Sequence, residues 1–214
     1  MNSILDCIES EEVSLAILAF KIQALQFDLN RDLAFVSMKD QVLRGRTLVL
    51  SAAKANLFGP SREVKPDTCD VLVIGGGVGG ISVALTAIEL GYSATVVEPE
   101  VECFPVLGLG SDRLFSATVY DWPHSHFDAH SFPFIPTLRS EGIVEALKPV
   151  AKVLAFPGKA VSAGELRKLL LAQLTNFEAA HSDRLRVLRR HRLDKFMDVY
   201  VNSSWRIQPV DATH

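Results

Sequence analysis

The chain has 214 residues, of which 48% are hydrophobic and 22% charged, with a formal net charge of -3. This balance is typical of a soluble globular protein with enough apolar material for a packed core. A nucleic-acid-binding protein would normally show a basic face, and a membrane-spanning helix would need a longer apolar run than this sequence contains. Because Cys7, Cys69 and Cys103 are far apart in the sequence, we expect no disulfide framework and a reducing, cytoplasmic compartment.

The first 65 residues are predicted to form a helical arm followed by a linker. Apolar residues recur there at the three-and-four spacing of one helical face, at Leu15, Leu18, Ile22, Leu25, Leu29, Leu33 and Val36, and the stripe continues at Leu43, Thr47 and Leu50. This pattern predicts one long helix, or two helices joined near Arg44-Gly45. The stripe favours a packing role and could also mediate homo-oligomerisation. The helical pattern ends at Phe58-Gly59-Pro60, and a domain boundary is expected near residue 65.

A change of pattern at Cys69 indicates a strand, a helix and a second strand. The apolar run Asp70–Ile74 predicts a buried strand, Gly79–Leu90 a helix that ends at Gly91, and Ala94–Val97 another buried strand. Such a βαβ unit implies parallel strands joined by a right-handed crossover. The predicted fold class is therefore α/β, with an incomplete Rossmann-like parallel sheet in residues 66–214.

The turn between the first strand and its helix has the glycine spacing of a dinucleotide-binding loop. Its residues are Gly75, Gly76, Gly77, Val78, Gly79 and Gly80. Gly75 would allow the tight turn, Gly77 would let the backbone approach a pyrophosphate, and Gly80 would let the helix pack closely on the sheet. The helix N-terminus would offer N–H groups and a positive dipole end to the phosphates.

A carboxylate at the end of the second strand is expected to complete this site. Glu98 lies where it can accept hydrogen bonds from ribose hydroxyls, and Pro99 follows it at the same edge. Glu98, Glu100 and Glu102 cluster where a 2′-phosphate would lie, and no arginine directly follows them in the sequence. Charge repulsion therefore argues against NADP.

The C-terminal third contains a second helix signal and two strand signals. Ser162-Ala163-Gly164-Glu165 is a capping box that predicts a helix to about Ala180, followed by strands at Leu185–Leu193 and Met197–Ile207. No regular structure is predicted for most of residues 103–137. The histidines near His124 and His130 have metal-capable side chains, but the chain is too short for the barrel in which such a pair binds metal, and we expect no metal site.

The stretch Asp70–Glu98 resembles the first FAD-contacting segment of flavin-dependent oxidoreductases that have a glutathione-reductase-type FAD domain. The resemblance continues more faintly to about residue 210. It implies that the cofactor is FAD, with NAD as the alternative, and that the strand after the helix 163–180 supplies backbone contacts to adenine, for which Val187 is the candidate. The later elements of that family have no counterpart in this sequence, so residues 66–214 correspond only to its opening half.

Two functions follow as expectations. The first is a FAD-dependent oxidoreductase, or the cofactor-binding portion of one, in which the flavin carries hydride or electron transfer to an unidentified small-molecule substrate. The second is a non-catalytic NAD- or FAD-binding module whose helical arm mediates assembly. No catalytic residue can be named for either function.

Overall fold

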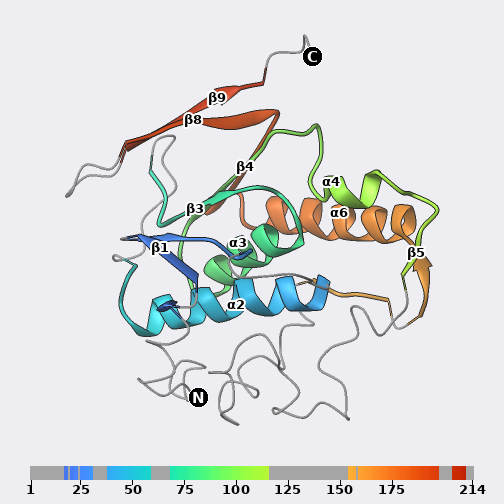
Figure 1. Ribbon diagram of the computed structural model, residues 1–214, viewed down its shortest axis with the longest axis horizontal. Coiled ribbons are helices and arrows are strands. Elements are labelled where there is room, and N and C mark those ends of the chain that lie inside the picture. The colour runs from blue at the N-terminus through green and yellow to red at the C-terminus, as the bar shows by residue number, and fades with distance from the viewer. Residues whose placement is uncertain are drawn as a thin grey trace.

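The computed structural model describes residues 17–18, 20–23, 25–30, 38–58, 68–115, 154–157, 159–197 and 204–210. Its strands are β1 (Lys21–Gln23), β2 (Gln26–Phe27), β3 (Val71–Ile74), β4 (Ala94–Glu98), β5 (Leu114–Phe115), β6 (Val161–Ser162), β7 (Leu185–Arg189), β8 (His191–Met197) and β9 (Ser204–Pro209). Its helices include α2 (Met38–Lys54), α3 (Val78–Glu89), α4 (Pro105–Gly108) and α6 (Ala163–Ala180). Figure 1 shows their arrangement.

A three-stranded parallel sheet forms the centre of the described fold. Its strand order is β3-β4-β7, with Val73 opposite Val96 and Val96 opposite Val187. The helix α3 connects β3 to β4, which gives the predicted βαβ unit, and α6 precedes β7 in a second connection of the same kind. The chain is therefore an α/β protein with a parallel sheet flanked by helices, as the sequence predicts.

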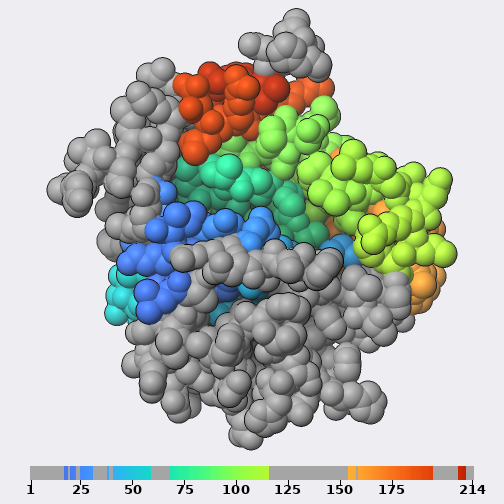
Figure 2. Space-filling model, viewed as in Figure 1, coloured from blue at the N-terminus to red at the C-terminus, as the bar shows by residue number. Residues whose placement is uncertain are grey.

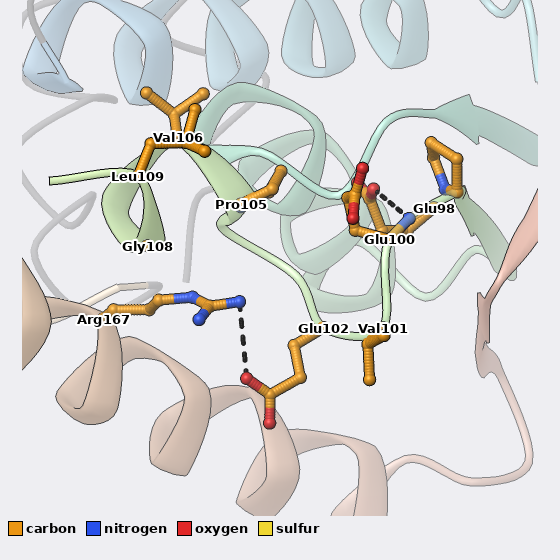
Figure 3. Close-up of a pocket in the computed structure, with 10 residues that line it drawn as sticks. Glu98, Glu100, Val101, Glu102, Pro105, Val106, Gly108, Leu109 and Arg167 are labelled. Carbon is orange, nitrogen blue, oxygen red and sulfur yellow. Dashed lines mark hydrogen bonds and ion pairs between the residues drawn. The ribbon is translucent and has the colours of Figure 1, made fainter. Parts of the chain in front are cut away.

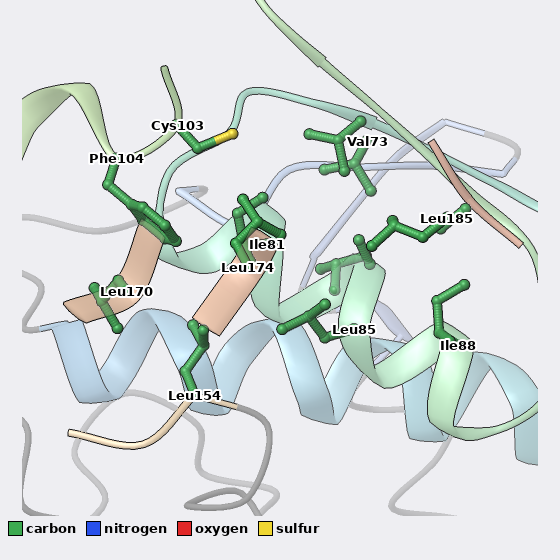
Figure 4. Close-up of a cluster of buried hydrophobic side chains, with 14 of the residues drawn as sticks. Val73, Ile81, Leu85, Ile88, Cys103, Phe104, Leu154, Leu170, Leu174 and Leu185 are labelled. Atoms are coloured by element: carbon green, nitrogen blue, oxygen red, sulfur yellow. The ribbon is translucent and has the colours of Figure 1, made fainter. Parts of the chain in front are cut away.

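One hydrophobic core joins the sheet to α3 and α6 (Figure 4). Ile81 and Leu85 of α3 and Leu170 and Leu174 of α6 are almost completely buried, as is Val96 of β4. The capping box predicted at the start of α6 is present, because the Ser162 side chain accepts from the Glu165 backbone N–H and the Glu165 side chain accepts from the Ser162 backbone N–H. The predicted helix start is thus confirmed in detail.

The prediction of one long helix over the N-terminal stripe is wrong. The strands β1 and β2 pair antiparallel there, and Leu25 has the left-handed φ of 57° that no helix interior adopts. Ile22 and Leu25 of the stripe are exposed rather than aligned on a packed face. The predicted joint near Arg44-Gly45 is also wrong, because α2 runs through both residues without a break.

Gly45 marks a close crossing of α2 and α3 instead. A Cβ added to Gly45 would lie 2.8 Å from the carbonyl oxygen of Gly79, and a Cβ on Gly79 would lie 2.7 Å from Oε1 of Gln41. Figure 1 shows α2 beside α3, and Val49 of α2 belongs to the same core as the sheet. The helical segment and the βαβ unit therefore share one core, while most of the predicted linker, at 59–67, lies outside the described residues.

Candidate functional site: the turn between β3 and α3

The three spaced glycines of the turn have the geometry that the motif requires. Gly75 has a φ of +103°, which side-chain-bearing residues rarely adopt, so the chain can leave β3 sharply. A Cβ on Gly80 would lie 2.1 Å from the carbonyl oxygen of Gly75 and 3.0 Å from Cγ1 of Val73. Because no such contact is sterically allowed, only glycine lets α3 approach the sheet this closely.

Gly77 faces open space at the start of α3. It is the N-cap residue, in extended conformation with φ -72° and ψ 178°, and within the described part of the chain no atom beyond its two chain neighbours lies within 4 Å of the position that its Cβ would take. No side chain caps the helix, and its first turn carries no acidic residue. The first N–H groups of a helix have no intrahelical acceptor, so this end of α3 presents donors and a positive dipole end next to free space. That combination suits a phosphate group.

Gly76 is held from both sides by the last residue of β4 and by the chain that follows this strand. Its N–H donates to Oε2 of Glu98 at 2.6 Å, and its carbonyl oxygen accepts from the N–H of Phe104 at 2.8 Å. A Cβ on Gly76 would lie only 2.7 Å from Sγ of Cys103. These contacts fix the peptide groups of Gly76 within the protein, so the groups that remain for a ligand begin at Gly77.

The Glu98 carboxylate is both buried and hydrogen-bonded. The residue is 3% exposed, and its Oε1 accepts from the N–H of Glu100 at 2.8 Å while Oε2 accepts from Gly76. Each carboxylate oxygen can accept more than one hydrogen bond, so ribose hydroxyls could still be accommodated. In the described structure, however, the carboxylate first stabilises the glycine turn.

Cys103 and Phe104 are buried beneath the turn. Burial raises the pKa of the Cys103 thiol to about 11, although the positive charge of Arg189 acts in the opposite direction. Phe104 has a left-handed φ of 57°, and its side chain is part of the core. The thiol is therefore protonated at neutral pH and acts as a packing group rather than as a nucleophile.

An open groove of about 540 Å³ lies beside Glu98 (Figure 3). It is lined mainly by the segment that follows β4, together with one residue of α6: Glu98, Pro99, Glu100, Val101, Glu102, Pro105, Val106, Gly108, Leu109 and Arg167. Figure 2 shows this segment, in green to yellow-green, on the surface of the molecule. Three carboxylates and one guanidinium thus meet several exposed apolar side chains in one depression.

Two ion pairs border this region. Arg189, at the carboxyl end of β7, makes a bidentate contact with Glu178 of α6, with N–O distances of 3.1 and 2.6 Å, and these hydrogen bonds raise the pKa of the Arg189 guanidinium. Arg167 of α6 lies 3.3 Å from Oε2 of Glu102. Sequence reasoning missed both arginines, because each lies far along the chain from the glycine turn and no local motif marks it.

The remaining predicted site residues fall in different places. Pro99 is exposed and lines the groove next to Glu98. Val78 packs against the core at the first turn of α3, and Gly79 faces α2. Val187 lies in the middle of β7, opposite Val96, and also packs against the core, so it is two residues from the strand end at which Glu98 and Arg189 are paired in register. The structure therefore groups the glycine turn with Glu98 and Pro99 and places Val187 in β7, on the other side of β4 from β3, where its contact with adenine stays a prediction.

Within the described residues, no group of three or more His, Cys, Asp or Glu side chains is arranged to hold a metal ion. The segment from His124 to His130 lies outside those residues. None of the helices in the described ranges combines the length and the apolar character that crossing a membrane requires. Comparisons of the chain with protein-family models, with curated proteins and with solved structures gave no match.

Proposed function

We propose that this chain binds the ADP half of a dinucleotide at the turn between β3 and α3, with FAD as the first candidate and NAD as the second. In this proposal the chain is a FAD-dependent oxidoreductase or the cofactor-binding portion of one. The observation that carries the proposal is the free space at Gly77, which adjoins the uncapped N-terminus of α3. A purely structural glycine turn would not need that space.

The neighbouring residues fit the ADP group of either cofactor. The pyrophosphate would lie against the N–H groups that begin at Gly77, at a helix end that no side chain caps. The ribose would lie towards Glu98, and the adenosine would extend into the groove lined by Pro99 and Glu100. A bound flavin would supply hydride or electron transfer, while the residues described here would fix only the ADP end.

A non-catalytic nucleotide-binding module remains the second candidate. No histidine, cysteine, serine or tyrosine lines the groove among the described residues, and the nearby Cys103 thiol is buried and protonated. In this alternative, the apolar stripe predicted to mediate assembly could not act as one continuous helical face. Leu43, Thr47 and Leu50 of α2 are already buried within a single chain, whereas Leu18, Ile22 and Leu25 are exposed.

The direct experiment is to purify the protein, record its absorption spectrum, denature it and identify any released nucleotide by chromatography and mass spectrometry. The proposal expects FAD, seen as a flavin spectrum, or NAD, and competition by ADP when the protein is reloaded. A protein that releases no nucleotide and does not bind FAD, NAD or ADP in calorimetry would contradict it.

Stopped-flow mixing of FAD-loaded protein with a panel of amino acids, amines and nicotinamides separates the two candidates. Rapid, saturable bleaching of the flavin by one donor would support the enzyme. Tight FAD binding without bleaching by any donor would favour the module.

A further inference from the structure

Two arginines near the carboxyl end of the sheet differ in how completely their guanidinium groups are satisfied. Arg189 is held by Glu178 through two hydrogen bonds, of 3.1 and 2.6 Å. The ion pair of Arg167 is a single contact of 3.3 Å to Glu102, and its Nε is buried without a hydrogen-bond acceptor. A charged N–H···O contact is normally about 2.7–2.9 Å long, and a guanidinium has five N–H donors. Arg167 is therefore held less tightly by its carboxylate partner than Arg189 is.

The contact between Glu102 and Arg167 is also accessible to a ligand. The side chain of Glu102 is 51% exposed and that of Arg167 is 25% exposed, and both line the groove that contains Glu98. Figure 3 shows this pair at one end of the groove and Glu98 with Glu100 towards the other. Because water screens exposed ion pairs, this pair contributes little to the stability of the fold, so replacing Glu102 should release Arg167 without unfolding the protein.

We infer that Glu102 and Arg167 form a selectivity pair, which decides whether the groove accepts an adenosine that carries an additional phosphate on its ribose. While Glu102 holds Arg167, the remaining charged groups of the lining are the carboxylates of Glu98 and Glu100. A ribose phosphate would meet these carboxylates without a free cation, and the unphosphorylated adenosine is preferred. This inference rests on the proposed function, since it assumes that the adenosine lies in the groove.

The test compares ADP with 2′-phospho-ADP by calorimetry and uses the ratio of their dissociation constants as the readout. Glu102→Gln should free Arg167 and lower the ratio of the 2′-phospho-ADP constant to the ADP constant about tenfold, as expected for a new charge-assisted contact. The double variant Glu102→Gln, Arg167→Gln should lose most of that gain. Glu100→Gln is the matched control, because it removes the same charge from the same groove without contacting Arg167, and it should change the ratio only about twofold through screened repulsion.

The outcomes separate the selectivity pair from simple charge repulsion. An equal change of the ratio in Glu102→Gln and Glu100→Gln would overturn the inference, and so would a gain that survives the loss of Arg167. An unchanged ratio in Glu102→Gln, with normal ADP binding, would overturn the inference and leave the proposed function standing. If ADP itself does not bind to the parent protein, the proposed function fails and the inference fails with it.

Discussion

Replacing Glu98 by alanine tests how the carboxylate and the glycine turn depend on each other. The change removes the acceptor of two backbone N–H groups, those of Gly76 and Glu100, from a residue that is 3% exposed. Hydrogen bonds to a charged group contribute about 1.5–3 kcal/mol each. Glu100 lies at the surface, where water can replace part of its hydrogen bond, so we expect the free energy of unfolding to fall by about 3 kcal/mol, near the lower end of the sum.

The assay is urea unfolding followed by circular dichroism, with Glu100→Ala as the matched control. The Glu100 side chain is exposed, so its removal should change the free energy of unfolding by less than about 0.5 kcal/mol. Under conditions where Glu98→Ala is folded, it should also weaken ADP and ADP-ribose equally, by about 1–3 kcal/mol, because the ligand contact is to ribose. A Glu98→Ala protein that is as stable as the control would refute the proposed support of the turn, and unchanged ADP affinity would refute the ribose contact.

Three further predictions follow from the packing of the same region. Gly80→Ala places a Cβ 2.1 Å from the Gly75 carbonyl oxygen, so chemical denaturation should show a loss of about 3 kcal/mol, whereas Gly110→Ala, whose Cβ would meet its nearest atom at 3.9 Å, should unfold like the parent. Ser162→Ala removes the cap of α6 and should cost about 1 kcal/mol in the same assay; an unchanged midpoint would contradict the capping role. Since burial raises the pKa of Cys103 to about 11, iodoacetamide at pH 8 should leave this thiol unmodified in the folded protein and label it after denaturation, as read by peptide mass spectrometry. Rapid labelling of the folded protein would show that the thiol is not buried.

The elements predicted correctly from the sequence are those that short-range signals specify. The run Val71–Ile74 forms the predicted strand, although the expected burial is found only at Val73 and Ile74 is 54% exposed, and the helix after it begins and ends within one residue of the prediction. The capping box at Ser162 determines the start of α6 through hydrogen bonds between residues three apart. In each case the residues that carry the signal also make the interaction.

The pairing of β1 with β2 could not be predicted in this way, because the spacing of apolar residues in 15–36 matches a helical face. What decides the structure there is the turn at Leu25 and tertiary packing. Arg44 of α2 lies 4.7 Å from the centroid of the Phe20 ring and donates to the carbonyl oxygen of Leu29. Contacts between residues so far apart in the sequence leave no periodic signal.

Only the part of the candidate site that short-range signals specify was predicted. The glycine spacing identifies the turn, and strand order places Glu98 beside it. The sequence does not indicate that the Glu98 carboxylate is already hydrogen-bonded to Gly76, or that Arg167 reaches the groove from α6, because both facts depend on how β4, its following loop and α6 pack together.

The measurement that tests the central claim most directly is calorimetric titration of ADP into the parent protein, Gly77→Val and Gly110→Val. A Cβ at Gly77 would meet no atom of the described residues within 4 Å, its two chain neighbours aside, and the backbone there is extended, so the variant should melt close to the parent temperature. The side chain would occupy the space assigned to the pyrophosphate, so Gly77→Val should show no ADP binding, while the parent and Gly110→Val bind equally. A folded Gly77→Val protein that binds ADP as tightly as the parent would contradict the assignment of this turn as the dinucleotide site.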